Sequence, residues 1–264
     1  MNRDSIPEPW RAVRWLAHRG AGRLAPENTL AAFRIGAQHG LRAFECDVNT
    51  STDGVAFLMH DDTLRRTTGH SSGTGGRSWA ELAALDAGSW HSAAFAGEPI
   101  PTLATIAQFC MATDSLLNIE IKPTPGRERA TGRHVAIDAA RLWRAHAALP
   151  LLSSFSTVAL AAARNAAPQL PRALLLDALP DDWFAQAQAL RCAAVVLHYP
   201  LVDAALVAKL HAAGRLAMAY TVNDAEVAER LFGCGVDALI TDAIDRLPAC
   251  AATAERNAAV TQLR

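Results

Sequence analysis

The chain has 264 residues, 51% of them hydrophobic and 19% charged, a composition typical of a folded protein. Its 25 Lys and Arg residues are balanced by 26 Asp and Glu residues, which leaves no basic surplus to attract nucleic acid or an anionic membrane. The five cysteines are scattered without a CxxC pair, which favours reduced thiols over disulfides or a zinc site. There is no secretory signal pattern and no apolar run of membrane-spanning length. We therefore expect a cytoplasmic protein without stable membrane association.

The N-terminal part of the chain predicts a strand over Val13–Ala17, a helix over Pro26–Gly40 and a second strand over Ala43–Asn49. Proline at the start and glycine at the end are common boundaries of a helix. The dipeptide Asp53-Gly54 is a strong hairpin signal. We expect this hairpin to return the chain along the second strand and to bring His60 close to it.

A change in composition follows at residues 63–99, which are rich in Gly and Ser and contain one short helical piece. A segment of this length without regular structure is unusual between two adjacent elements of a compact domain. We interpret it as an insertion into the main fold that lies over one end of it.

From residue 103 onward, helices alternate regularly with short apolar strands. The expected strands are Leu116–Lys122, Leu151–Phe155, Ala173–Asp177, Ala194–His198, Leu216–Val222 and Ala238–Thr241. The expected helices are Leu103–Met111, Thr131–Ala147, Val158–Asn165, Asp182–Ala189, Val202–Ala213 and Ala225–Phe232, with a helical tail after the last strand. Uniformly apolar strands separated by helices are buried on both faces and are therefore parallel. Eight such units predict an α/β fold of the (β/α)₈ TIM-barrel type, in one domain over residues 1–264, with a small insertion after the second strand. A doubly wound sheet is the alternative, but no GxGxxG motif follows the first strand.

Three carboxylates stand near the ends of neighbouring strands. Glu45 and Asp47 are two residues apart, so their side chains share one face of the second strand, and Glu120 lies near the end of the third. In a barrel these carboxyl ends meet at the catalytic face. Three inward acids without a counter-ion would be costly to bury, whereas a hard divalent cation such as Mg²⁺ or Ca²⁺ prefers oxygen ligands. The pattern predicts one divalent cation at this end of the barrel.

Two histidines and two cationic side chains converge on the same place. His18 ends the first strand and His60 follows the hairpin, and imidazoles that titrate near neutral pH suit general acid and base catalysis. Arg19 and Lys122 add positive charge, as an anionic substrate requires. Together with a metal, these groups fit attack on a phosphodiester.

Several ordered motifs give the chain a family resemblance. The runs HRGAGRLAPENTLAAF, ECDV…DG…HDDTLRRTTG, the segment Ile100–Leu103 and the tetrapeptide EIKP resemble the glycerophosphodiester phosphodiesterase family, over nearly the whole chain. The resemblance implies a TIM barrel with a small inserted segment and a divalent metal. It also implies three roles for residues of this chain: metal ligands Glu45, Asp47 and Glu120, acid/base residues His18 and His60, and phosphate contacts Arg19 and Lys122. The family commonly has tryptophan before Thr-Val-Asn on the seventh strand, where this chain has Tyr220, which keeps an aromatic wall for the substrate.

The activity we expect is metal-dependent hydrolysis of glycerophosphodiesters, such as those of choline or ethanolamine, to sn-glycerol 3-phosphate and an alcohol. The sequence leaves open which histidine is the base and whether water or a substrate hydroxyl attacks first. One alternative is a phospholipase D-like lyase or hydrolase of lipid phosphodiesters, which the even charge and the lack of an apolar surface helix disfavour. A second is a non-catalytic barrel that binds a phosphodiester, for which two intact acid/base histidines are unnecessary. A metal-dependent isomerase or aldolase would leave those histidines unexplained.

Overall fold

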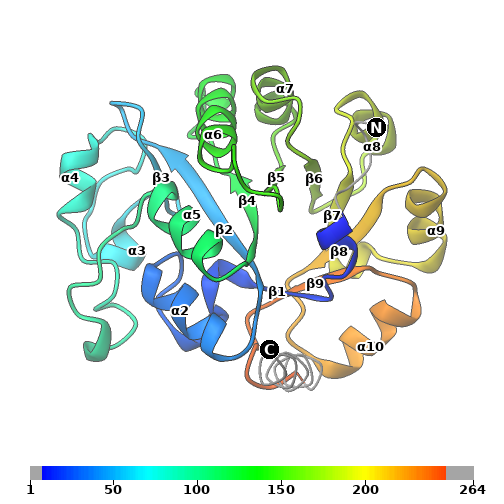
Figure 1. The fold of residues 1–264 in the computed structure, drawn as a ribbon, viewed down its shortest axis with the longest axis horizontal. Coiled ribbons are helices and arrows are strands. Elements are labelled where there is room, and N and C mark those ends of the chain that lie inside the picture. Colours follow the sequence, from blue (N-terminus) through cyan, green and yellow to red (C-terminus); the bar gives the residue numbers. More distant parts are fainter. Residues whose placement is uncertain (1–7, 248–264) are drawn as a thin grey trace.

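The fold was obtained as a computed structural model that describes residues 8–247, and it is built around one sheet (Figure 1). The strands are β1 (Trp15–Ala17), β2 (Ala43–Thr50), β3 (Ala56–Leu58), β4 (Leu116–Ile121), β5 (Leu151–Ser154), β6 (Arg172–Leu176), β7 (Ala194–His198), β8 (Leu216–Tyr220) and β9 (Ala238–Thr241). All except β3 are parallel to their neighbours. Because β1 pairs with both β2 and β9, the eight parallel strands close into a barrel, and the TIM-barrel prediction is confirmed.

The helices lie on the outside of the barrel (Figure 1). Those that follow barrel strands are α2 (Leu30–Gln38), α5 (Leu103–Ala112), α6 (Glu128–Leu142), α7 (Thr157–Ala166), α8 (Trp183–Ala189), α9 (Ala204–Ala212) and α10 (Ala225–Gly233), and α1 (Glu8–Arg11) precedes β1. Among the described residues, no helix is both long enough and apolar enough to cross a membrane. The helical tail expected after β9 falls mainly at residues 248–264, outside the described part of the chain.

Two apolar layers hold these elements together. One fills the barrel and includes Leu16, Leu175 and Met218, whereas the other lies between strands and helices and includes Phe44 and Cys46. Alternation along each strand therefore decides which side chains enter the barrel. Phe44 and Cys46 face the helices, so Glu45 and Asp47, between and beyond them, face the barrel interior, as the spacing predicts.

Helix α2 begins four residues later than the sequence suggests. Pro26 and the residues after it form a loop, and Thr29 is the N-cap, whose hydroxyl accepts a hydrogen bond from Ala32 N at 3.2 Å. Asn28 has a φ of 57°, a left-handed conformation that a helix cannot contain. This loop carries functional side chains, and the helix starts only after it.

The hairpin signal at Asp53-Gly54 corresponds to an antiparallel pair, in which Val48 lies opposite Leu58. The insertion that follows contains two short helices, α3 (Arg65–Thr68) and α4 (Trp79–Ala83), and packs around its own small apolar cluster. One of its contacts with the barrel is a hydrogen bond from Ala31 N to Glu98 Oε1, at 2.9 Å. The insertion therefore lies against the start of α2, beside the carboxyl ends of the strands.

Candidate active site

Three carboxylates meet inside the barrel at the carboxyl ends of β2 and β4. Asp47 is the register partner of Glu120 across the two strands, and Glu45 is one inward position earlier. An oxygen atom of each lies within 4.8 Å of the others, a spacing that one cation can bridge. Glu45 Oε1 is buried and accepts no hydrogen bond from the described residues, and Glu120 Oε1 has only the Lys122 ammonium nearby, at 3.4 Å. Acceptors left unsatisfied in this way fit a metal ligand set.

The acid cluster is electrostatically strained without a cation. Burial, followed by the charges of Asp47 and Glu120, raises the pKa of Glu45 well above its ordinary value. Burial and the charge of Asp47 also raise the pKa of Glu120, to about 7. Burial opposes the ionisation of Asp47 as well, but the positive charge of Arg19 above all holds its pKa below the ordinary value. The cluster thus contains one firmly ionised carboxylate and two that gain from a cation.

The loop after β1 contacts two of these acids, Glu45 and Asp47. The backbone N–H of Arg19 donates to Glu45 Oε2 at 3.0 Å, and its guanidinium Nε lies 3.3 Å from Asp47 Oδ2. Arg19 has a φ of 53°, in the left-handed region of backbone conformation. Asn28 makes two hydrogen bonds with Asp47. Its Nδ2 donates to Asp47 Oδ2 at 2.8 Å, and its Oδ1 accepts from the Asp47 backbone N–H at 3.1 Å.

His18 lies at the end of β1, beside the acids. Its Nδ1 is 2.7 Å from Asp242 Oδ1, and its Nε2 is 3.8 Å from Glu45 Oε2. Asp242 follows β9 and is itself held by Asn223, whose Nδ2 donates to Oδ2 at 3.1 Å. The carboxylate fixes the ring, so that Nε2 faces the acid cluster.

His60 is held in the same manner from the hairpin side. Its Nδ1 is 2.7 Å from Asp61 Oδ1, and Arg66 on α3 donates to both Asp61 oxygens at 2.7 and 2.9 Å. Arg66 also donates to both oxygens of Glu27, at 2.6 and 2.7 Å, and Glu27 accepts from Arg19 Nη1 at 2.9 Å. A continuous chain of charged hydrogen bonds therefore connects His60 with Arg19.

Three aromatic side chains, Phe155, His198 and Tyr220, pack together at the carboxyl ends of β5, β7 and β8. We call them the aromatic wall, and we call this end of the barrel its mouth. The Tyr220 ring centroid lies 5.9 Å from that of Phe155 and 5.8 Å from that of His198. The Tyr220 hydroxyl donates to Leu176 O at 3.3 Å. Burial raises the pKa of that hydroxyl above its ordinary value, with smaller effects from the charges of Asp177 and Glu120. Phe155 is 42% exposed, which is unusual for a core residue, so its ring is available at the mouth.

The sequence-predicted residues are thus gathered at one end of the barrel, and three supporting residues were missed. In the sequence, Asn28 lies within the helix predicted over Pro26–Gly40, Asp242 stands outside every motif, and Arg66 occurs only within the run HDDTLRRTTG. Asp242 had the clearest signal, because it stands directly after the last strand, as His18 does after the first. The contact of Arg66 with Glu27 spans 39 residues, and no spacing rule predicts such a pair.

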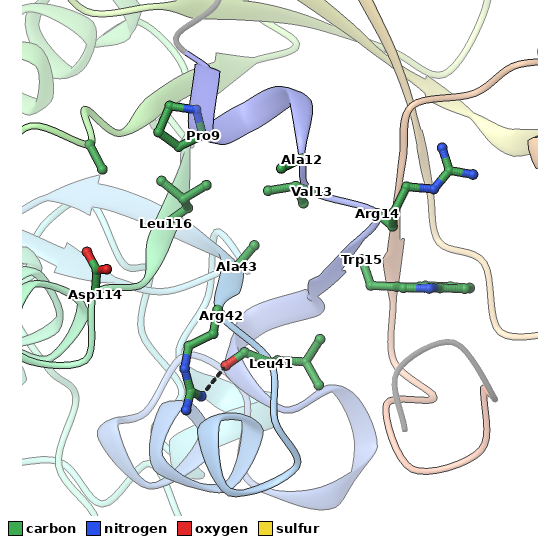
Figure 2. Close-up of a pocket in the computed structure, with 11 residues that line it drawn as sticks. Pro9, Ala12, Val13, Arg14, Trp15, Leu41, Arg42, Ala43, Asp114 and Leu116 are labelled. Carbon is green, nitrogen blue, oxygen red and sulfur yellow. Dashed lines mark hydrogen bonds between the residues drawn. The ribbon is translucent and has the colours of Figure 1, made fainter. Parts of the chain in front are cut away.

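A cavity lies at the opposite end of the barrel from the acids (Figure 2). Its lining is mainly apolar, with Val13, Ala43 and Leu116 at the amino ends of the strands, and its volume is about 440 Å³. The Arg42 guanidinium on its rim donates to Leu41 O at 2.9 Å. No histidine lines it, and catalytic sites of TIM barrels lie at the other face.

A TIM barrel with acids, histidines and cations collected at the carboxyl ends of its strands is the arrangement of a barrel enzyme for an anionic substrate. Residues 18–246 match the glycerophosphoryl diester phosphodiesterase family, and the chain belongs to this family. A glycerophosphodiester phosphodiesterase of Caldanaerobacter subterraneus is 34% identical over 234 residues, which cover 86% of this chain and 93% of the relative.

Solved structures agree with this assignment. A phosphodiesterase from Oleispira antarctica, in complex with the product sn-glycerol-3-phosphate, is 34% identical, covers 90% of this chain and 96% of its own, and superposes with a TM-score of 0.83. A glycerophosphodiester phosphodiesterase from Agrobacterium tumefaciens is 25% identical, with a TM-score of 0.73 and coverage of 91% of this chain and 99% of its own.

Proposed function

We propose that the protein hydrolyses glycerophosphodiesters to sn-glycerol 3-phosphate and a free alcohol, with one divalent cation and two histidines. The family assignment supports the overall reaction, and the Oleispira relative binds the glycerol phosphate product. The observation that supports the metal dependence is the buried cluster of Glu45, Asp47 and Glu120. Among the described residues, Glu45 Oε1 has no hydrogen-bond donor, and Glu120 Oε1 has only the Lys122 ammonium, at 3.4 Å.

Mg²⁺ or Ca²⁺ fits these residues, since all the ligand atoms offered are carboxylate oxygens. When bound there, such a cation supplies Lewis acidity toward the phosphoryl oxygens. Lys122 lies 3.4 Å from Glu120 and Arg19 lies 3.3 Å from Asp47, so both add positive charge beside the cluster, where the transition state gains negative charge. Asn28 keeps the Asp47 carboxylate in place, so that its oxygens do not turn away from the cluster.

His18 and His60 carry the proton transfers. One imidazole takes the proton of the attacking oxygen as the new P–O bond forms, and the other donates a proton to the alkoxide as the old P–O bond breaks. Both rings are oriented by a carboxylate at Nδ1, which leaves each Nε2 free to face the substrate. The reaction consumes one water. The alcohol keeps the proton given by the acid histidine, and the cycle closes when the base histidine releases the proton it took from the water and the acid histidine regains one from solvent.

Product analysis tests the proposal. Purified protein is incubated with a panel of glycerophosphodiesters, with Mg²⁺ or Ca²⁺ and with a chelator, and sn-glycerol 3-phosphate and free alcohol are measured in parallel. We expect equal amounts of both products and loss of turnover in the chelator, restored by added cation. Turnover that persists in the chelator would refute the metal requirement. Release of a phosphorylated alcohol together with free glycerol would refute the reaction.

A further inference from the structure

A cavity of about 360 Å³ lies beside the acid cluster, between the loop that follows β1 and the insertion. This volume falls within the range of small-ligand sites, roughly 300–1,000 Å³. We call it the side cavity. Its principal lining residues are His18, Arg19, Arg23, Glu27, Trp90 and Asp242.

The side cavity opens directly onto the catalytic groups. His18 lines it, and Nε2 of the same ring is 3.8 Å from Glu45 Oε2. Arg19 also lines it and contacts Asp47 at 3.3 Å. A phosphodiester has two ester arms, and the aromatic wall of Phe155, His198 and Tyr220 occupies another part of the mouth. A substrate whose phosphate lies at the acids therefore has a separate space for each arm.

Only some of the charged side chains that line the side cavity have an ion-pair partner. Glu27 is already paired with Arg19 and with Arg66, and Asp242 is paired with His18. The exposed guanidinium of Arg23, by contrast, has no ion-pair or hydrogen-bond partner among the described residues. Arg23 thus adds a positive charge that no described residue neutralises, and this charge opposes a cationic ligand group in the side cavity.

Trp90 offers an apolar surface in the same space. Its indole N–H donates to Ala87 O at 2.9 Å, so the ring is fixed, and the side chain is nevertheless 40% exposed. The guanidinium of Arg66 lies 5.6 Å from this ring and takes up part of its capacity to attract a cation. His91 Nε2 donates to Arg23 O, 3.1 Å away, whereas its Nδ1 is without a hydrogen-bond partner among the described residues.

We propose that the side cavity binds the alcohol arm of the diester and selects polyhydroxy or anionic alcohols over quaternary ammonium alcohols. Arg23 provides hydrogen-bond donors for hydroxyl or anionic oxygens, and the Trp90 ring supports the carbon skeleton of a ring-shaped polyol. This inference rests on the proposed function and names the substrate class within it.

The test compares two substrates of the intact protein, glycerophosphoinositol and glycerophosphocholine, which release the same glycerol phosphate. We expect the wild-type protein to hydrolyse the inositol diester with the higher kcat/KM. In Arg23→Glu the preference should shift about tenfold toward the choline diester, mostly through KM. The substitution changes the side-chain charge by two units close to the cationic choline group, in a site of high dielectric constant. Arg23→Gln should shift it in the same direction by a smaller factor.

Arg34→Glu is the matched control, since Arg34 is an exposed arginine on α2 with the same charge change and is not part of the lining. It should leave the substrate ratio unchanged. Hydrolysis of both diesters with the same ratio in the wild type, Arg23→Glu and Arg23→Gln would overturn the assignment of the side cavity and leave the proposed function intact. Hydrolysis of neither diester by the wild type would overturn both.

Discussion

Asp242 Oδ1 lies 2.7 Å from Nδ1 of His18, although the two residues are separated by 224 positions in the chain. The pair joins the residue after the last barrel strand to the residue after the first. A carboxylate at Nδ1 fixes the ring tautomer and directs Nε2 toward the acid cluster, where the substrate phosphate is proposed to lie.

Asp242→Asn should therefore lower kcat by about 100-fold, the size expected for the loss of one well-oriented acid/base group. KM should change less than kcat, because Asp242 acts on the reaction through His18 and is only one of several residues that line the side cavity. Steady-state kinetics with a glycerophosphodiester measures both constants. Asp237→Asn is the control, since Asp237 pairs with His211 at 2.9 Å before β9, at the opposite end of the barrel. Equal loss of kcat in the two variants would contradict a role specific to His18.

The acid cluster predicts a change in metal affinity. Glu45→Gln removes a carboxylate whose Oε1 has no protein partner, so the affinity for Mg²⁺ or Ca²⁺ should fall at least about tenfold. Titration calorimetry measures this directly, and Glu229→Gln, at an exposed position of α10, should bind the cation as the wild type does. Unchanged affinity in Glu45→Gln would remove Glu45 from the ligand set.

The raised pKa of Glu120 predicts how pH affects the metal-free protein. Its pKa is about 7 in the folded state, above the ordinary value of 4.5 that applies when the chain is unfolded. Between these values the folded state binds more protons, so the free energy of unfolding decreases as the pH rises through this range.

Glu120→Gln removes the contribution of Glu120 to this pH dependence and leaves that of Glu45. In a chelator at pH 8 the variant should be more stable than the wild type by about 1–3 kcal/mol, whereas below pH 4.5 the two should unfold alike. Urea unfolding at several pH values measures the difference. Added Mg²⁺ should stabilise the wild type and have little effect on the variant. A wild type that gains stability from pH 5 to pH 8 in the chelator would contradict the buried, strained carboxylate.

Arg66 predicts a link between the insertion and catalysis. It donates to Glu27 and to Asp61, so Arg66→Gln should loosen both His60 and Arg19 and lower kcat about tenfold. Arg65→Gln is the control, because Arg65 is the adjacent exposed arginine of α3 and has no side-chain partner among the described residues. A similar kcat in the two variants would show that the charged chain from His60 to Arg19 has no catalytic importance.

The sequence predicted those parts of the site that follow from strand periodicity. Glu45 and Asp47 share a face because they are two apart on one strand, and Glu120 joins them because neighbouring parallel strands end together. His60 was predicted from a local hairpin signal. Glu45, Asp47 and His60 depend on local geometry, whereas Glu120 follows from the strand order of the barrel.

The remaining contacts could not be predicted because they depend on loop conformation and tertiary packing. The apparent helix start at Pro26 hid the left-handed residue Asn28, whose side chain grips Asp47. The partners of Arg66 come from separate parts of the chain and meet only when the insertion packs against α2. The charge of Arg66 alone does not tell which of the many Asp and Glu residues in the sequence it will contact.

The closure of the barrel has a consequence for protein synthesis. Because β1 pairs with β9 and His18 with Asp242, the imidazole cannot acquire its carboxylate until nearly the whole barrel has left the ribosome. A nascent or truncated chain that stops before residue 242 has all three acids and both histidines but lacks the group that orients one of them. The order in which the strands are made thus decides when His18 acquires the carboxylate that orients it.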